Sequence, residues 1–163
     1  MMDFNNVDFQ SAFNLIPNNE IAKARLVLRG APVNSCITLG RNEGTAYLNC
    51  EFVILEGKYA KRKVFDKIGI EGNEKWVNAG KARIKAILES ANGISPRDTS
   101  EKAVKARQIE SYLDLNGLDI VIKIGIEHDS TGIYQDRNRV AAIITPDHAQ
   151  YEQYMNGADN IPW

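Results

Sequence analysis

Residues 45–70 carry the pattern that most constrains how this chain folds. In the first half of this segment every second residue is apolar: Ala46, Leu48, Cys50, Phe52 and Ile54. Because the side chains of a β-strand alternate between two faces, this pattern predicts a strand that is buried on one side. A turn signal at residues 56–58 follows, and a second strand-like run leads to residue 70. The segment therefore predicts two strands joined by a tight turn.

The second strand of this predicted hairpin mixes cations and aromatic rings on one face. Strand periodicity places five residues together there: Tyr59, Lys61, Lys63, Phe65 and Lys67. Rings combined with cations suit a polyanion with flat bases, which is a single-stranded nucleic acid. A purely solvated face would not favour a phenyl ring between two lysines. Phe65 therefore either stacks on a ligand or packs beneath a helix or the N-terminal residues.

The 163 residues carry a formal net charge of −1 that is unevenly distributed. After Thr145 there are three acids, Asp147, Glu152 and Asp159, and no Lys or Arg. Residues 1–145 therefore carry a formal charge of +2. A mildly basic body followed by an acidic tail favours an anionic partner for the body.

Turn signals and hydrophobic periodicity divide the rest of the chain into further elements. Alternating and β-branched runs predict strands, and apolar residues at helical spacing predict helices. The expected strands are 20–29, 118–127 and 139–145, and the expected helices are 74–91 and about 100–113. Lys23 and Arg25 would project outward from the strand at 20–29.

The order of three strands, a helical insertion and two strands matches the OB-fold, a five-stranded Greek-key barrel. We therefore expect an α+β protein, mainly β, with about two helices between the third and fourth strands of the barrel. The OB-fold domain would span residues 20–146, between an N-terminal arm at 1–19 and an acidic C-terminal tail at 147–163. Two helices instead of one leave open a different α+β sheet with the same strand order.

An OB-fold barrel binds its ligand on its second and third strands and in the loops after its first and fourth strands. The predicted DNA contacts gather on that surface: Lys23, Arg25, Arg41, Tyr47, Tyr59, Lys61, Lys63, Phe65, Lys67, Tyr134 and Arg137. The cations would neutralise phosphates and release counterions, which favours binding at low salt. Each ring that stacks on a base would contribute roughly 1–3 kcal/mol, with little sequence preference.

Sequence motifs for catalysis and metal binding are absent. Cys36, Cys50, His128 and His148 do not form the clustered ligands of a zinc site. Paired catalytic carboxylates, a nucleophile–histidine pair and phosphate-binding loops are also missing. We therefore expect no enzyme activity, cofactor or metal. The chain has no apolar run of membrane-spanning length and no signal peptide, which predicts a soluble, cytoplasmic protein with reduced thiols.

The segment Asp159-Asn160-Ile161-Pro162-Trp163 resembles the tip of the acidic tail of bacterial single-stranded DNA-binding proteins, with Trp in place of Phe. Residues 9–17, 41–65 and 145–148 resemble phage-encoded proteins found near recombination genes. The resemblance implies a phage single-stranded DNA-binding protein of replication or recombination, located in the host cytoplasm. It also implies a tip that docks replication or recombination enzymes through Asp159, Ile161, Pro162 and Trp163.

Several alternatives remain open. The leading function is a non-catalytic single-stranded DNA-binding protein, with a homo-oligomer among its possible states. The alternative is a protein-interaction module, an inhibitor or adaptor of a host protein, that uses the same basic and aromatic hairpin face. A nuclease with dispersed carboxylates ranks last, because strand parity separates its candidates, Glu43, Glu51 and Asp66. The tail also has an alternative, a helical turn packed on the body through Tyr151, Tyr154 and Met155.

Overall fold

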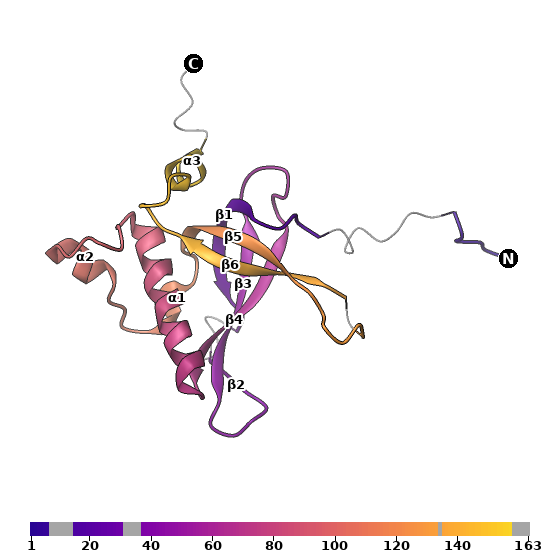
Figure 1. Cartoon of the computed structure of the whole chain (residues 1–163), viewed down its shortest axis with the longest axis horizontal. Coiled ribbons are helices and arrows are strands. Elements are labelled where there is room, and N and C mark those ends of the chain that lie inside the picture. Colours follow the sequence, from indigo (N-terminus) through magenta and orange to yellow (C-terminus); the bar gives the residue numbers. More distant parts are fainter. Residues whose placement is uncertain (7–14, 31–36, 134, 158–163) are drawn as a thin grey trace, which may run out of the picture.

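The sheet is assembled around β3, Ala46–Ile54 (Figure 1). The structure is a computed structural model that describes residues 1–6, 15–30, 37–133 and 135–157. The other strands are β1 Glu20–Leu28, β2 Ile37–Leu39, β4 Lys63–Glu71, β5 Asp119–Glu127 and β6 Arg137–Ile144. The helices are α1 Glu74–Asn92, α2 Glu101–Ala106, the 3-10 helix η2 Tyr112–Leu115 and α3 Tyr151–Met155.

The six strands form one antiparallel sheet in which β3 has neighbours on both edges. β4 lies along one edge of β3. β1 and β2 share the other edge, β1 against the C-terminal half of β3 and β2 against its N-terminal end. β1 continues the sheet to β5, and β5 pairs with β6. The sequence does not predict β2, because this strand is only three residues long and lies within an expected loop.

The predicted hairpin of β3 and β4 is confirmed, but its turn is longer than expected. β3 ends at Ile54 and β4 begins at Lys63, so residues 55–62 form the connection. Within it, Lys61 has a φ of +75°, in the left-handed region that a strand does not use. The prediction that Tyr59 and Lys61 share a strand face with Lys63 is therefore wrong, since both residues lie in the turn.

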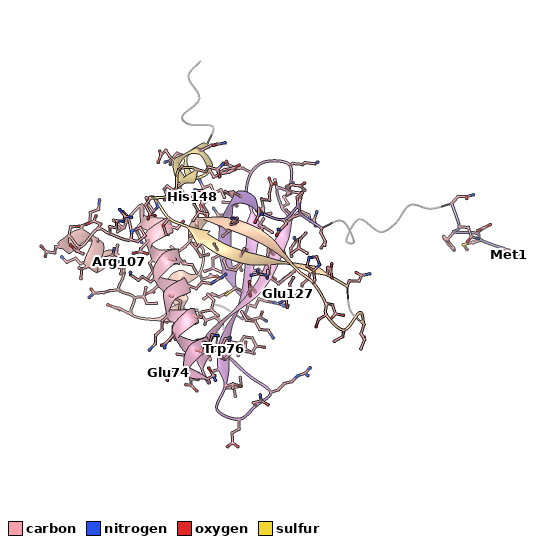
Figure 2. All side chains as sticks on the ribbon, viewed as in Figure 1. Met1, Glu74, Trp76, Arg107, Glu127 and His148 are labelled. Carbon is pink, nitrogen blue, oxygen red and sulfur yellow. The ribbon has the colours of Figure 1, made fainter. Side chains whose placement is uncertain are left out.

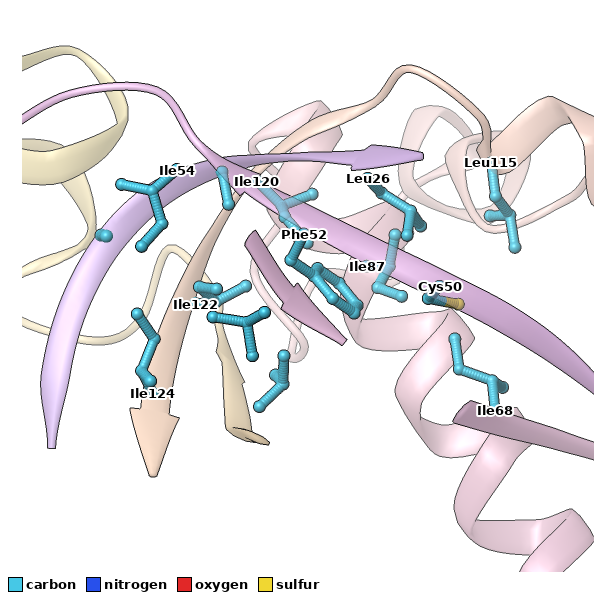
Figure 3. Close-up of a cluster of buried hydrophobic side chains, with 14 of the residues drawn as sticks. Leu26, Cys50, Phe52, Ile54, Ile68, Ile87, Leu115, Ile120, Ile122 and Ile124 are labelled. Atoms are coloured by element: carbon cyan, nitrogen blue, oxygen red, sulfur yellow. The ribbon is translucent and has the colours of Figure 1, made fainter. Parts of the chain in front are cut away.

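The apolar face of β3 packs into the main core, as its alternation predicts. Side chains from β1, β3, β5 and α1 meet there (Figure 3), among them Leu26, Phe52, Ile87, Ile120 and Ile122. The predicted core position of Cys50 is confirmed. Full burial of each large apolar side chain contributes about 1.5–3 kcal/mol. A shift of one residue in the strand register would move all the buried side chains of a strand to the solvent side. The core packing therefore fixes which residues face outward.

The sheet is not closed into a barrel. Within the described residues, no backbone ladder joins β4 to β6. Side chains bridge the two strands instead. The carboxylate of Asp66 in β4 accepts a hydrogen bond from the Val140 N–H of β6 at 3.0 Å, and Arg83 of α1 donates to the Val140 carbonyl at 3.1 Å. The α+β class is confirmed, whereas the predicted barrel is not closed: side chains, and not a backbone ladder, make the contact between β4 and β6.

α1 lies against both strands that border this gap (Figure 1). The side chain of Asn73 caps its start by accepting a hydrogen bond from the Lys75 N–H at 2.9 Å. Gly93 ends the helix in the left-handed region, with a φ of +66°. Gly69 of β4 and Gly80 of α1 allow a close approach, because a methyl group on Gly80 would collide with the Gly69 carbonyl oxygen.

The second expected helix is replaced by two shorter pieces, α2 and η2. Arg107 follows α2 and turns toward α1 (Figure 2). Its Nε donates to the Glu89 carboxylate at 2.8 Å, and its Nη2 donates to the carbonyls of Ser95 and Asp98 at 3.1 and 2.7 Å. Glu89 is only 3% exposed, so this is a buried ion pair that ties α1 to the segment after it.

Residues near both termini pack against the rest of the protein. Ile16 is buried, and its backbone exchanges two hydrogen bonds of 2.9 Å with the Asn138 side chain of β6. Tyr151 of α3 is 5% exposed and donates a hydrogen bond to the Ser90 carbonyl of α1. Burial raises the pKa of the Tyr151 hydroxyl. The docked-turn alternative is therefore correct for the described part of the tail; residues 158–163 lie outside the described residues.

We expect Glu89→Ala to destabilise the protein by about 3 kcal/mol or more, because it leaves Arg107 buried without its carboxylate. Urea unfolding followed by circular dichroism measures the loss. Glu101→Ala is the matched control, since Glu101 pairs with Lys105 at 3.7 Å on an exposed helix face. Its loss should cost less than about 0.5 kcal/mol. Equal losses for the two variants would contradict a stabilising buried pair.

Candidate nucleic-acid interface

Outward-pointing residues of β1, β3 and β4 form a continuous surface, which we call the outer face. It comprises Arg25, Val27, Arg29, Tyr47, Asn49, Glu51, Val53, Lys63, Phe65 and Lys67. Cross-strand pairing sets its rows: Lys63 lies opposite Val53, which lies opposite Arg25. Burial of the alternate residues holds this side of the three strands outward. The predicted DNA contacts that the structure brings together here are Arg25, Tyr47, Lys63, Phe65 and Lys67.

Phe65 projects from the middle of the outer face and is 43% exposed. The guanidinium of Arg29 lies over its ring, 5.9 Å from the ring centroid. Lys63 and Lys67 flank it on β4. Phe65 is therefore exposed and not part of the core that the described residues form. Its ring is accessible to a flat ligand and is surrounded by cations.

A second ring and cation lie toward β2. The ammonium of Lys67 is 4.7 Å from the centroid of the Tyr47 ring. Thr38 of β2 lies opposite Tyr47 and extends the outer face by one strand. Arg41 is exposed in the turn after β2, at the same end of β3. At this end of the outer face the Tyr47 ring therefore lies beside Lys67. Among the described residues, Lys67 forms no ion pair with a carboxylate.

Glu51 places a negative charge at the centre of the outer face. It lies opposite Phe65, and its side chain is 17% exposed. One carboxylate oxygen is 3.6 Å from Nε of Arg29, and the other is 3.5 Å from Nζ of Lys63. Glu51 thus contacts both Arg29, whose guanidinium lies over the phenyl ring, and Lys63, two residues before Phe65 on β4. It also neutralises part of their charge, which would reduce the attraction of a phosphate.

Arg25 is also paired. Its Nε donates to Asp119 of β5 at 2.8 Å, and this hydrogen bond raises the pKa of Arg25. Two residues before Arg25 on β1, Lys23 lies opposite Val121 of β5. Lys23 and Tyr59 line a separate cleft of about 200 Å³ between the β3–β4 turn and α3.

The β5–β6 hairpin contributes less positive charge than expected. Arg137 is the first residue of β6, not a loop residue, and donates to Glu127 at 2.8 Å. The ring Nδ1 of His128 lies 2.7 Å from the Asp136 carboxylate. The Asp129 N–H and His128 lower the pKa of Asp136. Tyr134, the aromatic residue predicted to act here, lies outside the described residues.

Two charged residues of the outer face, Arg29 and Glu51, are missing from the sequence-predicted contacts. Arg29 follows the last residue of β1, and continuing the alternation of Lys23 and Arg25 by four residues identifies it. Glu51 faces outward by the same alternation in β3. Its effect on the neighbouring cations depends on the pairing of β1, β3 and β4, which a single strand pattern does not give.

The carboxylates considered for a nuclease do not converge. Glu51 is on the outer face, whereas Asp66 bonds to Val140 in the gap between β4 and β6. Glu43 is exposed in the turn after β2. In the described part of the chain, no group of His, Cys, Asp and Glu could hold a metal ion. No helix there is long and apolar enough to cross a membrane.

The chain matches no protein-family model and no curated protein. Its function is therefore inferred from the chemistry of the outer face.

We expect Phe65→Ala to leave the fold intact and to change the free energy of unfolding by less than about 1 kcal/mol, because the ring is a surface group. Phe52→Ala is the matched control, since Phe52 is fully buried in β3. Loss of that ring should cost about 3–5 kcal/mol. Urea titrations of both variants measure the difference, and a Phe65 loss as large as the Phe52 loss would assign Phe65 to the core.

Proposed function

We propose that this chain is a non-catalytic single-stranded DNA-binding protein whose binding surface is the outer face. The observation that carries the proposal is the exposed ring of Phe65 between Lys63 and Lys67, with the guanidinium of Arg29 over it. A single exposed ring is common on protein surfaces, but one that is flanked by cations offers a stacking platform to a base. The nearby cations suit the phosphates that join successive bases.

The geometry suggests how a strand would bind. Phe65 and Tyr47 lie on adjacent strands of the same face and would each stack one base. A base on Phe65 would take the place of the Arg29 guanidinium, which would then exchange its contact with Glu51 for one with a phosphate. Lys63 and Lys67 would contact the backbone on either side. Every base has a flat face, so this binding would have little sequence preference.

We also propose that the fold is an OB-fold, in its partly open form. Three observations support this assignment. The sheet neighbours run β4, β3, β1, β5 and β6. The two end strands approach each other through Asp66 and Val140. The outer face lies on the second and third strands of this arrangement, counting β1, β3 and β4, where OB-folds bind their ligands.

The biological setting that we propose is phage replication or recombination in the host cytoplasm. It rests on the resemblance of residues 9–17, 41–65 and 145–148 to phage-encoded proteins. Recruitment of partner enzymes by Asp159, Ile161, Pro162 and Trp163 stays a prediction, because these residues lie outside the described ones. The docked segment 151–155 indicates that such a tip would start from a fixed point on the body.

The alternative is a protein-interaction module that uses the same surface. Leu39 of β2 is 80% exposed and Ile37 is 39% exposed, but both lie opposite buried residues of β3 and therefore face the other side of the sheet. On the outer face itself, an exposed ring among paired charges is also a pattern found where proteins bind each other. Binding to an oligonucleotide distinguishes the two functions.

We expect the protein to bind fluorescein-labelled oligo(dT) more tightly at low salt than at high salt, and more tightly than duplex DNA. Phe65→Ala should weaken oligo(dT) binding by about tenfold, the loss of one stacked base. Fluorescence anisotropy titrations measure both effects. Val104→Ala is the control, because Val104 is 47% exposed on α2, away from the outer face.

Absence of binding to oligo(dT), oligo(rU) and duplex DNA would overturn the proposed function and favour the protein-interaction module. Equal weakening by Phe65→Ala and Val104→Ala would show that the outer face is not the binding surface. Metal-dependent loss of the oligonucleotide during the titration would favour the nuclease.

We expect Glu51→Gln to have the opposite effect to Phe65→Ala. It should strengthen oligo(dT) binding by roughly two- to fivefold at low salt. The substitution keeps the shape of the side chain but frees the charges of Arg29 and Lys63 for phosphates. Glu101→Gln on the exposed face of α2 is the charge-matched control. The same anisotropy titration applies, and weaker binding by Glu51→Gln would mean that Glu51 positions these cations more than it neutralises them.

A further inference from the structure

A pocket of about 180 Å³ lies where β4, β6 and α1 meet, in the gap that the sheet leaves open. Its walls include Lys67 of β4, Trp76 and Arg83 of α1, and Arg139 of β6. Trp76 lies near the start of α1, beside β4 (Figure 2). Gly69 and Gly80 allow close packing at this pocket, because a Cβ on Gly69 would collide with the Trp76 ring and one on Gly80 with the Gly69 carbonyl oxygen.

The charges around this pocket do not balance. Three cations line it, Lys67, Arg83 and Arg139, against one carboxylate, that of Asp66. This carboxylate already accepts the Val140 N–H at 3.0 Å and lies 3.9 Å from Nη1 of Arg83. Neither Arg139 nor Lys67 forms an ion pair within 4.0 Å among the described residues. The pocket therefore has more positive charge than its own residues compensate.

The position of Arg83 strengthens this imbalance. Its side chain is 24% exposed, so its charge is screened less than that of a solvated lysine. Burial and the nearby charge of Arg139 both lower the pKa of Arg83, although Asp66 acts in the opposite direction. Two guanidinium groups that repel each other across a hollow are stabilised by an anion between them, and guanidinium groups match phosphate oxygens in geometry.

We propose that this pocket binds a phosphate group, with Arg83 and Arg139 as its main ligands. The pocket and the outer face meet at Lys67, which lines the pocket and carries its ammonium over Tyr47. A DNA strand on the outer face that continues past Tyr47 would bring a phosphate to the pocket. This source of the phosphate rests on the proposed function, whereas the affinity for phosphate itself does not.

Trp76 lines the pocket, so its fluorescence emission can report binding there. The chain has two tryptophans, so a Trp163→Phe background leaves Trp76 as the reporter. In that background, inorganic phosphate should change the emission of Trp76 in a saturable way, and chloride at equal ionic strength should not. Arg139→Gln should weaken the phosphate response by about tenfold. Arg97→Gln, on an exposed residue after α1, should leave the response unchanged.

Comparing the binding of oligo(dT) with and without a 5′-phosphate then identifies the source of the phosphate group. Tighter binding of the 5′-phosphorylated strand that disappears in Arg139→Gln assigns the site to a strand terminus. A response to inorganic phosphate without that preference assigns it to free phosphate or to the internal backbone. Phe65→Ala should weaken oligo(dT) binding by about tenfold but keep the response to inorganic phosphate, so the site is tested even if the proposed function fails.

The proposal is overturned if phosphate produces no saturable change in Trp76 emission. It is also overturned if Arg97→Gln weakens the response as much as Arg139→Gln, because the effect would then be one of overall charge. Circular dichroism of each variant confirms that it is folded, which the exposed position of Arg139 makes the expected result.

Discussion

The pairing of β3 with β1 on one edge and β4 on the other is the constraint on which the rest of the structure depends. Because β3 buries every second residue, its partners must adopt the register that continues the same buried face. This register puts Val64 and Ile68 of β4 in the core and turns Phe65 outward. The arrangement of rings and cations is therefore a consequence of core packing on the opposite side of the same strands.

Most of the fold follows from local patterns in the sequence. The alternation in β1, β3 and β5 and the helical spacing in α1 predict these elements to within a few residues, because each buries one face. β2 and the closing contact between β4 and β6 are not predictable in this way. β2 is too short to show a period, and the contact of β6 with its neighbours across the gap is made by Asp66 and Arg83, which come from different elements.

The candidate site was predictable where strand periodicity applies and not where it ends. Lys63, Phe65 and Lys67 share a face because they belong to one regular strand. Tyr59 and Lys61 fail the same rule because the chain leaves the strand conformation in the turn. The charge balance was less accessible, since the partners of Arg25 and Arg29 come from β5 and β3 and depend on the sheet order.

The central position of β1 also affects how the chain folds. β1 lies between β3 and β5, so the first strand is completed only by a strand from the far part of the chain; Arg25 and its partner Asp119 are 94 residues apart. Ile16 and Asn138 are separated by 122 residues. Contacts between such distant residues require large loops to close first, which slows folding. The β3–β4 hairpin and α1 involve nearer neighbours, so most of the outer face can form before β1 finds its second partner.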